Sequence, residues 1–260
     1  MVRNKIIKNS SSELRPKWRG KKKPYDNNEK NSIDEVSNPG LASERLKKEM
    51  VDRLFFQGIK DEIVLGAMLK VPRHLFVDSA LSSRAYEDNA LPIGFQQTIS
   101  QPYIVGRMIS LAIKFLSRTK CKNFTNTKIL EIGTGCGYQA AVLDKCFGKV
   151  FSIERIFLLH QESKKRLASL CPTVETRFGD GLDGWSEKAP FNVIIFSGNM
   201  EIIPIKLLEQ TSIGGFIIMP FGKSSQNLVV LVKSDNVPEN YQKYVFDLVK
   251  FVPILSGIEK

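Results

Sequence analysis

The feature that most constrains the fold is the segment 128–155, which reads KILEIGTGCGYQAAVLDKCFGKVFSIER. A short apolar run surrounds Glu131, and three glycines follow at alternate positions, namely Gly133, Gly135 and Gly137. Such a run before a glycine-rich turn is typical of a buried parallel strand, and glycine lacks the Cβ that would obstruct a ligand. Apolar residues at helical spacing come next, and a second apolar run ends in Glu154. The segment therefore predicts a βαβ unit with a ligand site at its first turn.

The two glutamates indicate the class of ligand. Glu154 follows the first glycine by about twenty positions, where a nucleoside-binding βαβ unit places the acceptor for its ribose hydroxyls. Glu131 would repel a phosphate, whereas a dinucleotide fingerprint directs a helix N-terminus at a pyrophosphate. A cationic nucleoside fits both carboxylates, and S-adenosylmethionine carries an ammonium, a sulfonium and a nucleoside. The glycines alone would also fit a structural tight turn; the flanking strands and Glu154 favour the nucleoside site.

Length and charge limit the organisation of the chain. Its 260 residues, 42% of them hydrophobic, suit one large α/β domain with an appendage. The formal net charge is +11, and residues 1–40 hold ten Lys or Arg against five Asp or Glu. We expect residues 1–40 to be a disordered extension, because they are rich in Lys, Asn, Ser and Pro and poor in periodic apolar residues. The basic run 19–23 is interpreted as part of a solvated tail, with contact to nucleic acid or an acidic partner as the alternative.

The cysteines and the apolar runs suggest where the protein works. Four cysteines occur without a Cys-x-x-Cys motif and with only two histidines, so neither a zinc site nor a disulfide framework is predicted. No apolar run approaches the length of a bilayer span, and residues 1–8 lack the apolar core of a signal peptide. We therefore expect a protein of a reducing compartment, without a membrane partner.

The rest of the chain alternates between helical and strand patterns. Helices are expected at 43–55, 61–70, 104–116, 158–170 and 204–210, and further strands at 174–178, 191–196, 216–219, 228–232 and 244–252. This alternation predicts an α/β fold, with a doubly wound, mostly parallel sheet and an antiparallel C-terminal edge. We divide residues 41–260 into N-terminal helices with a substrate loop (41–120) and a cofactor-binding sheet (121–260). Ligands bind at the carboxyl ends of such strands, where Glu131, Glu154, Asp180 and Ser197 all fall.

The segment 86–103 lacks helical periodicity and is rich in polar residues. Long irregular segments inside a compact domain commonly serve a site. Thr98 and Ser100 supply hydroxyl groups, and Pro102 is preset for the first turn of the next helix. Ser100 either caps this helix or binds the carboxylate of a substrate, and the two roles are compatible.

Six sequence stretches together resemble the protein-L-isoaspartate O-methyltransferase family. They are ALPIGFQQTISQPY (90–103), LEIGTGCGYQAAVL (130–143), SIER (152–155), GDG (179–181), GGFIIMPFG (214–222) and FVPILSG (251–257). The resemblance covers residues 41–257 and implies a class I S-adenosylmethionine-dependent methyltransferase fold. It implies methyl transfer from S-adenosylmethionine to the α-carboxylate of L-isoaspartyl residues in damaged proteins and peptides, which starts repair through a succinimide. A cytoplasmic monomer is expected.

The resemblance also implies roles for individual residues. Ser100 corresponds to the active-site serine, with Thr98 and Ile99 beside the cofactor. The methionine part of the cofactor would be lined by Glu131, Gly133, Gly135 and Gly137, its ribose would meet Glu154, and its adenine would meet Asp180 and Gly181. The Gly-Asp-Gly stretch would also fit an ordinary turn. Asn192 and the segment 196–200 depart from the family pattern, so we expect differences in the substrate pocket rather than in the cofactor site.

The chemistry of such a reaction suits this composition. A carboxylate acceptor is ionised at neutral pH and needs no general base. We therefore expect structural roles for His74 and His160. Two other interpretations remain: a methyltransferase acting on RNA or a small molecule, and a module that binds the cofactor without turnover.

Overall fold

The computed structural model describes residues 39–118, 124–237 and 240–260. From Pro39 onward they form one compact unit. The extension predicted for residues 1–40 lies outside the described residues, except that Pro39 and Gly40 already belong to the first helix. Its expected disorder and its contact with nucleic acid therefore stay predictions.

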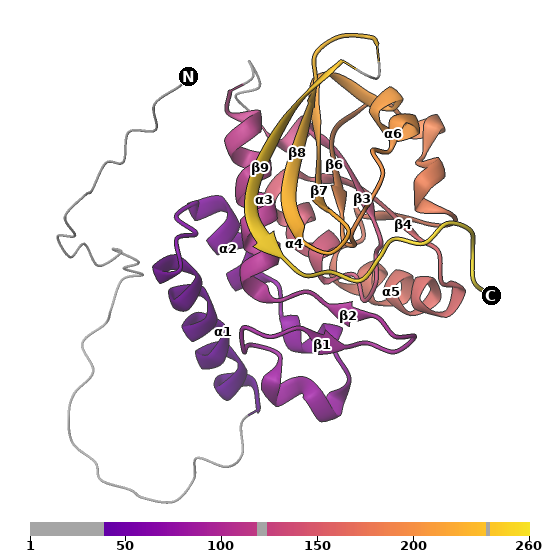
Figure 1. Cartoon of the computed structure of the whole chain (residues 1–260). Helices are drawn as coiled ribbons and strands as arrows, with labels where there is room; N and C mark the ends of the chain where they lie inside the picture. The colour runs from indigo at the N-terminus through magenta and orange to yellow at the C-terminus, as the bar shows by residue number, and fades with distance from the viewer. Residues whose placement is uncertain (1–38, 119–123, 238–239) are drawn as a thin grey trace, which may run out of the picture. The chain divides into compact units, whose positions relative to one another are not determined.

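A seven-stranded sheet forms the centre of the unit, in the order β5-β4-β3-β6-β7-β8-β9 (Figure 1). Its strands are β3 (Lys128–Ile132), β4 (Lys149–Glu154), β5 (Glu175–Phe178), β6 (Phe191–Phe196), β7 (Thr211–Phe221), β8 (Gln226–Lys233) and β9 (Tyr241–Val249). The first five in spatial order pair in parallel, β8 is antiparallel to β7, and β9 is antiparallel to β8. The predicted fold class is confirmed.

The central strands are apolar on both faces because both faces are covered. In β3, Ile129 belongs to one core and its neighbour Leu130 to the other, and both are fully buried. Val193 and Ile194 of β6 separate in the same way. Successive side chains of a strand point to opposite faces, so a continuous apolar run is what a sheet between two layers requires.

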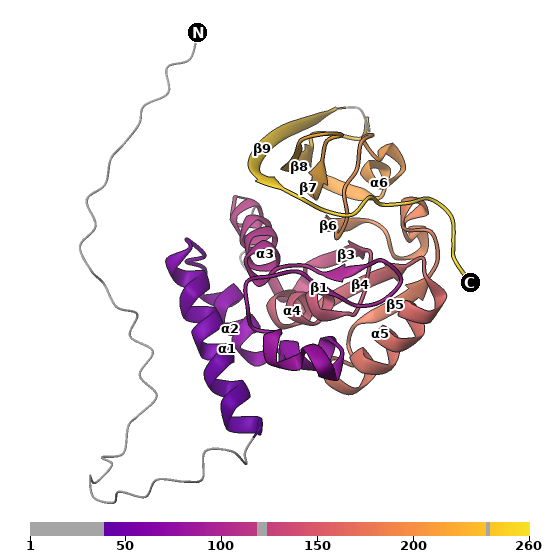
Figure 2. The same cartoon turned by 60° about the horizontal axis from the view of Figure 1, so that its bottom comes forward.

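Helices cover one face of this sheet and shorter elements the other (Figure 2). The helices are α1 (Pro39–Phe56), α2 (Glu62–Lys70), α3 (Pro102–Leu116), α4 (Tyr138–Phe147), α5 (Phe157–Leu170) and α6 (Ile205–Glu209). Helix α4 packs on β3 and β4, α5 packs on β4 and β5, and α2 joins α1 to α4. The opposite face is covered by α6 and by 3-10 turns, among them η4 (Gly181–Asp183) and η5 (Ser186–Lys188).

The helix boundaries follow local sequence rules. The Asp61 carboxylate accepts hydrogen bonds from the amides of Ile63 and Val64 and so caps α2. Helix α2 ends at Lys70, two residues before Pro72, as predicted. Two 3-10 turns, η1 (Arg73–Phe76) and η2 (Ser79–Arg84), then lead to a small hairpin of β1 (Leu91–Pro92) and β2 (Thr98–Ile99).

The C-terminal segment departs from the prediction. The strand expected to reach residue 252 ends at Val249, and residues 250–259, here called the C-terminal strap, cross the carboxyl ends of β6, β5 and β4 (Figure 2). The strap pairs with the end of β6, because the Asn199 amide donates to the Val252 carbonyl (2.8 Å) and the Ile254 amide donates to the Asn199 carbonyl (2.9 Å). Such main-chain pairing between distant segments gives no periodic signal in the sequence. Among the described residues, none of the helices combines the length and the apolar character that a bilayer crossing requires.

Candidate functional site

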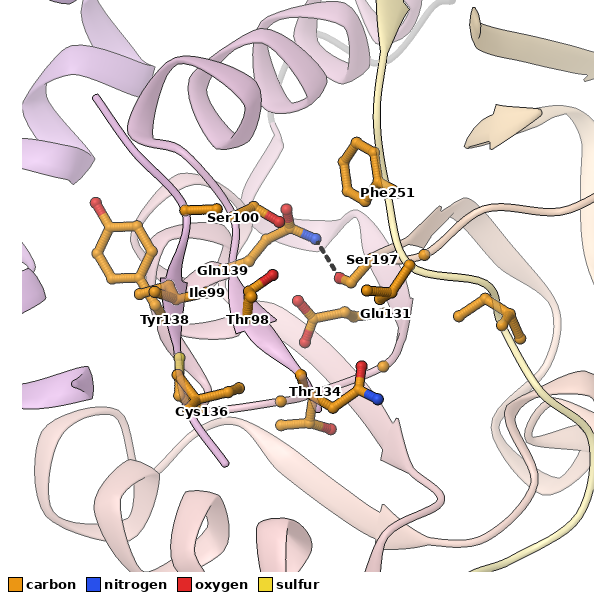
Figure 3. Close-up of a pocket in the computed structure, with 18 of the residues that line it drawn as sticks. Thr98, Ile99, Ser100, Glu131, Thr134, Cys136, Tyr138, Gln139, Ser197 and Phe251 are labelled. Atoms are coloured by element: carbon orange, nitrogen blue, oxygen red, sulfur yellow. Dashed lines mark hydrogen bonds between the residues drawn. The ribbon is translucent and has the colours of Figure 1, made fainter. Parts of the chain in front are cut away.

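A cavity of about 290 Å³ lies at the carboxyl ends of β3, β4 and β6, between the β1–β2 hairpin and the C-terminal strap. Most residues predicted for the site line it: Thr98, Ile99, Ser100, Glu131, Gly133, Gly135 and Glu154. Side chains from the hairpin, from β3, from the start of α4 and from the strap surround this space (Figure 3). The structure thus brings the two glutamates of the predicted cofactor site and the loop containing Ser100 into one cavity.

The glycine turn needs a backbone that other residues rarely adopt. Gly133, Gly135 and Gly137 have φ angles of 91°, 53° and 93°. Gly137 does not line the cavity: it precedes α4, and a Cβ there would lie 3.1 Å from the Leu167 side chain. Because Gly137 lies outside the cavity, its predicted contact with the cofactor stays a prediction. In the structure it allows the chain to turn closely against α5.

Glu131 is a buried carboxyl group with an unpaired oxygen. Its side chain is fully buried, and Oε2 accepts a hydrogen bond from the Ser152 hydroxyl (2.5 Å). Oε1 has no hydrogen-bond partner among the described residues. Burial raises the pKa of Glu131 to about 8, although the Ser152 hydrogen bond acts in the opposite direction. A buried acceptor without a partner at a cavity wall is suited to a cationic donor, so this residue fits the ammonium of an amino acid.

Glu154 fastens the glycine turn to the end of β4. Its Oε2 accepts from the Gly135 amide (2.8 Å) and its Oε1 from the Ile156 amide (3.0 Å). Burial raises the pKa of Glu154, and the backbone hydrogen bonds oppose that shift. Each carboxylate oxygen accepts more than one hydrogen bond, so this side chain can still receive hydroxyl groups from the cavity.

Asp180 lies outside the cavity and is already bonded on both oxygens. Oδ1 accepts from the Leu182 amide (2.9 Å), and Oδ2 accepts from the Gly257 amide of the strap (2.6 Å). Gly181 does not line the cavity either, and a Cβ there would meet Ile132 at 2.5 Å. In this structure the Gly-Asp-Gly turn attaches the strap to the end of β5, and its predicted contact with adenine stays a prediction.

Ser100 lines the cavity, and its hydroxyl forms no hydrogen bond with any part of the chain that the structure describes. The alternative that Ser100 caps α3 is wrong, because Gln101 occupies the N-cap position. The start of the helix is instead served by Asp88, whose Oδ1 accepts from the Tyr103 amide (3.0 Å). The Ser100 hydroxyl is therefore available to a ligand in the cavity.

The sequence assigned no role at the site to Gln139 or to the strap residues that line the cavity, although it placed Ser197 at the ligand-binding ends of the strands. Gln139 of α4 donates from Nε2 to the Ser197 hydroxyl (3.0 Å), and both line the cavity (Figure 3). A glutamine in an otherwise apolar, buried stretch of helix was a usable signal for the first. Residues 250–255 of the strap also line the cavity, with Phe251 among them. Nothing local could place them, because they come from the far end of the chain.

Other residues singled out earlier lie elsewhere. His74 bonds through Nδ1 to the hydroxyls of Ser43 (2.9 Å) and Tyr86 (2.7 Å), and His160 is buried against Phe178; neither histidine lines the cavity. Asn192 departs from the family pattern but does not line the cavity, whereas Ser197 and Gly198 of the other departing segment do. The Asn192 Oδ1 accepts from the Lys128 amide (2.8 Å) at the opposite ends of the strands.

The residues present do not suggest a metal site. Within the described ranges no group of three or more His, Cys, Asp or Glu side chains could hold an ion. The described cysteines, Cys136, Cys146 and Cys171, are free and buried. Cys121 lies outside the described residues.

Comparison with known proteins gives a consistent result. The family described as protein-L-isoaspartate(D-aspartate) O-methyltransferase matches residues 44–259. A protein-L-isoaspartate O-methyltransferase of Bordetella petrii is 46% identical over 224 residues, which cover 85% of this chain and 79% of the relative. A protein of the same name from Nitrosomonas eutropha is 46% identical over 219 residues, which cover 84% of this chain and 95% of the relative.

Two solved structures share the fold. One is from Plasmodium falciparum, was assigned to the same kind of methyltransferase and was solved in complex with S-adenosyl-L-homocysteine. It has a TM-score of 0.69 and 19% identity, and covers 80% of this chain and 98% of that chain. The other, a protein-L-isoaspartate O-methyltransferase, has a TM-score of 0.69 and 24% identity, and covers 82% of this chain and 67% of that chain.

Proposed function

The chain belongs to the protein-L-isoaspartate(D-aspartate) O-methyltransferase family, and from this premise we propose how its cavity works. It transfers the methyl group of S-adenosylmethionine to the α-carboxylate of L-isoaspartyl residues in damaged proteins and peptides. The methyl ester then closes to a succinimide when the neighbouring backbone nitrogen attacks the ester carbonyl and methanol leaves, a step that needs no enzyme group. The observation that supports this assignment best is the shared cavity, which joins the unbonded Ser100 hydroxyl to the Glu131 and Glu154 carboxyl groups.

The donor end of the cavity is built for a cationic nucleoside. Glu131 would hold the ammonium of the methionine part through Oε1, the atom that lacks a partner. The turn containing Gly133 and Gly135 allows the backbone to approach that part closely. Glu154 would accept the ribose hydroxyls. When bound, S-adenosylmethionine supplies an electrophilic methyl group on a sulfonium.

The adenine of the cofactor would lie towards β5. Asp180 and Gly181 would meet the base there, as the family resemblance implies, although Asp180 now bonds to the Gly257 amide. For Asp180 to reach the base, the strap amide would have to share or release its oxygen. Ile156, which lines the cavity, offers an apolar surface for the base in either case.

The acceptor end is formed by the loop after β2. The Ser100 hydroxyl would donate a hydrogen bond to one oxygen of the isoaspartyl carboxylate, which orients the other oxygen towards the methyl group. Thr98 and Ile99, which precede Ser100 in β2, also line the cavity. No side chain has to remove a proton, because the carboxylate is the nucleophile.

Exclusion of water contributes to the rate. A carboxylate and a sulfonium lose their charges as the methyl group moves between them, so a site of low polarity favours the transition state over the charged reactants. The β1–β2 hairpin covers one side of the cavity, and the strap covers the other with Phe251, Pro253 and Ile254. Both segments would close around the reacting atoms.

The free cysteines support a proposal for the cellular setting. Three described cysteines are free, which suits a reducing compartment, and we propose that the protein acts in the cytoplasm. Isoaspartyl proteins would be its partners, and we expect it to act as a monomer. Sedimentation at micromolar concentration would test the oligomeric state.

Methyl transfer to matched peptides tests the proposed function. One peptide carries an L-isoaspartyl residue, and its control carries a normal aspartyl residue in the same sequence. We expect radiolabelled methyl ester on the isoaspartyl peptide alone. Binding of S-adenosylhomocysteine without transfer to either peptide would favour the non-enzymatic interpretation, and equal transfer to both would contradict isoaspartyl recognition.

A further inference from the structure

Arg73 is a buried cation without a counterion. None of its side-chain surface is exposed, and it is the largest fully buried side chain of the described part of the protein. Within the described residues, no carboxylate lies within ion-pair distance of its guanidinium. Burial accordingly lowers its pKa. A buried charge destabilises the folded protein unless hydrogen bonds compensate it. The hydrogen bonds that Arg73 makes therefore stabilise the buried guanidinium and fix its position.

Those bonds join the two ends of the irregular segment 86–103. Nε donates to the Ala85 carbonyl (2.7 Å), just before the irregular segment 86–103 begins. Nη2 donates to the Ser100 carbonyl (2.6 Å), near the end of the same segment. One planar guanidinium therefore fixes both ends of this loop, and its fork geometry suits two acceptors in fixed positions.

The Arg73 guanidinium also contacts the part of the cavity where the methyl donor would bind. The guanidinium lies over the Tyr138 ring, with Cζ 4.6 Å from the ring centroid. Tyr138 follows Gly137 and begins α4, the helix after the glycine turn, and it lines the cavity. Phe76 of η1 supports the ring in turn by an edge contact at 5.5 Å. Arg73 thus connects the backbone of the acceptor residue to the element that follows the donor-binding turn.

The bond to Ser100 lies next to the start of α3. The Ser100 carbonyl is the acceptor that the Ile104 amide would use if the helix began one residue earlier. Arg73 donates to this carbonyl, and Ser100 lies outside the helix and lines the cavity. The guanidinium thus holds the backbone of the residue whose hydroxyl faces the cavity.

We propose that Arg73 is a positioning residue for methyl transfer, which holds the Ser100 hydroxyl in line with the donor through the Ser100 carbonyl and the Tyr138 ring. The inference rests on the proposed function, since it assigns a task to the same cavity. It predicts that changes at Arg73 affect turnover of the isoaspartyl peptide much more than binding of the cofactor.

Two substitutions separate the parts of this role. Arg73→Lys keeps the charge but loses the fork, and Arg73→Met keeps an unbranched apolar stem over Tyr138 but loses charge and hydrogen bonds. A displacement of about 1 Å at a reacting group can cost about 100-fold in rate. We expect kcat/KM for the isoaspartyl peptide to fall by roughly 30- to 100-fold in Arg73→Met and by less in Arg73→Lys. The Kd for S-adenosylhomocysteine, measured by calorimetry, should change by less than about threefold.

Arg53 provides the matched control. Its Nη2 donates to the Tyr86 carbonyl (2.5 Å), next to the Ala85 carbonyl that Arg73 uses, but it bonds to neither Ser100 nor Tyr138. Arg53→Met should lower the thermal unfolding midpoint and leave kcat/KM within about threefold of the wild type. An equal loss of kcat/KM in both arginine variants would overturn the proposal, as would a folded Arg73→Met enzyme with unchanged kcat/KM.

A double-mutant cycle keeps the test decisive if Arg73→Met does not fold. Arg73→Lys is then measured in the wild-type and in the Ser100→Ala backgrounds. If Arg73 acts through Ser100, the substitution costs little more activity once the hydroxyl is absent. A loss that is the same in both backgrounds would show a merely structural role. The wild-type assay on paired peptides tests the proposed function separately, so its failure would be distinguishable from failure of this inference.

Discussion

Glu131 should release a proton when the cofactor binds. The fully buried carboxyl has a pKa of about 8 in the ligand-free protein, so it is mostly protonated at pH 6.5. An ammonium placed at the unpaired Oε1 favours the ionised form. The cost of ionising this carboxyl at pH 6.5 is about 2 kcal/mol, from 1.36 kcal/mol for each of about 1.5 pH units. Affinity at pH 6.5 should therefore be roughly 30-fold lower than above pH 8.

Calorimetry in buffers of different ionisation enthalpy counts this proton directly. We expect release of about one proton per S-adenosylhomocysteine bound at pH 6.5, and a release that diminishes towards pH 8.5. In Glu131→Gln the release should vanish and the affinity should lose most of its dependence on pH. Glu154, whose pKa burial also raises, is unchanged in this variant and serves as the internal control. The same proton release in wild type and Glu131→Gln would refute the reasoning.

The same carboxyl makes the ligand-free protein less stable as the pH rises. Its folded-state pKa lies above the unfolded value of 4.5, so its contribution to stability is complete below that value and is lost as the pH rises towards 8. The thermal midpoint of the wild type should thus fall between pH 5 and pH 8 relative to that of Glu131→Gln. Parallel curves for the two proteins would contradict the assigned shift.

Three further results are expected. Ser100→Ala should lower kcat for the isoaspartyl peptide by roughly 10- to 100-fold, because one hydrogen bond to a charged group is lost, while calorimetry shows a nearly unchanged Kd for S-adenosylhomocysteine; an equal loss of both would count against its role. Gly137→Ala should destabilise the protein by about 1–3 kcal/mol in urea unfolding, because φ is 93° and the added Cβ lies 3.1 Å from Leu167; an unchanged midpoint would be inconsistent with this packing. Removal of residues 1–38 should leave the rate on a short isoaspartyl peptide intact, and a collapse in rate would show that the extension supports the fold.

The sequence alone determined the class of fold and the donor end of the site. The apolar run of β3, the glycine turn and Glu154 lie within one continuous segment, so local spacing was enough to predict a βαβ unit with two carboxyl groups at its strand ends. The loop containing Ser100 was recognisable because its residues are polar and lack helical periodicity. Strand ends were less well defined: the last strand was predicted at 244–252, three residues too far towards the C-terminus, whereas β9 spans Tyr241–Val249.

Only the tertiary structure decided what meets across the cavity. The strap brings Phe251 and Val252 to a cavity at the ends of strands that precede them by more than fifty residues. The Gly257 amide of the strap also donates a hydrogen bond to Oδ2 of Asp180, the residue that the sequence assigned to adenine. Arg73 reads as an ordinary basic residue in the sequence, yet its guanidinium is buried between Ser100 and Tyr138. Local spacing reports which groups share one strand or one helix. Contacts between distant segments depend on how the whole chain packs, and no short-range pattern encodes them.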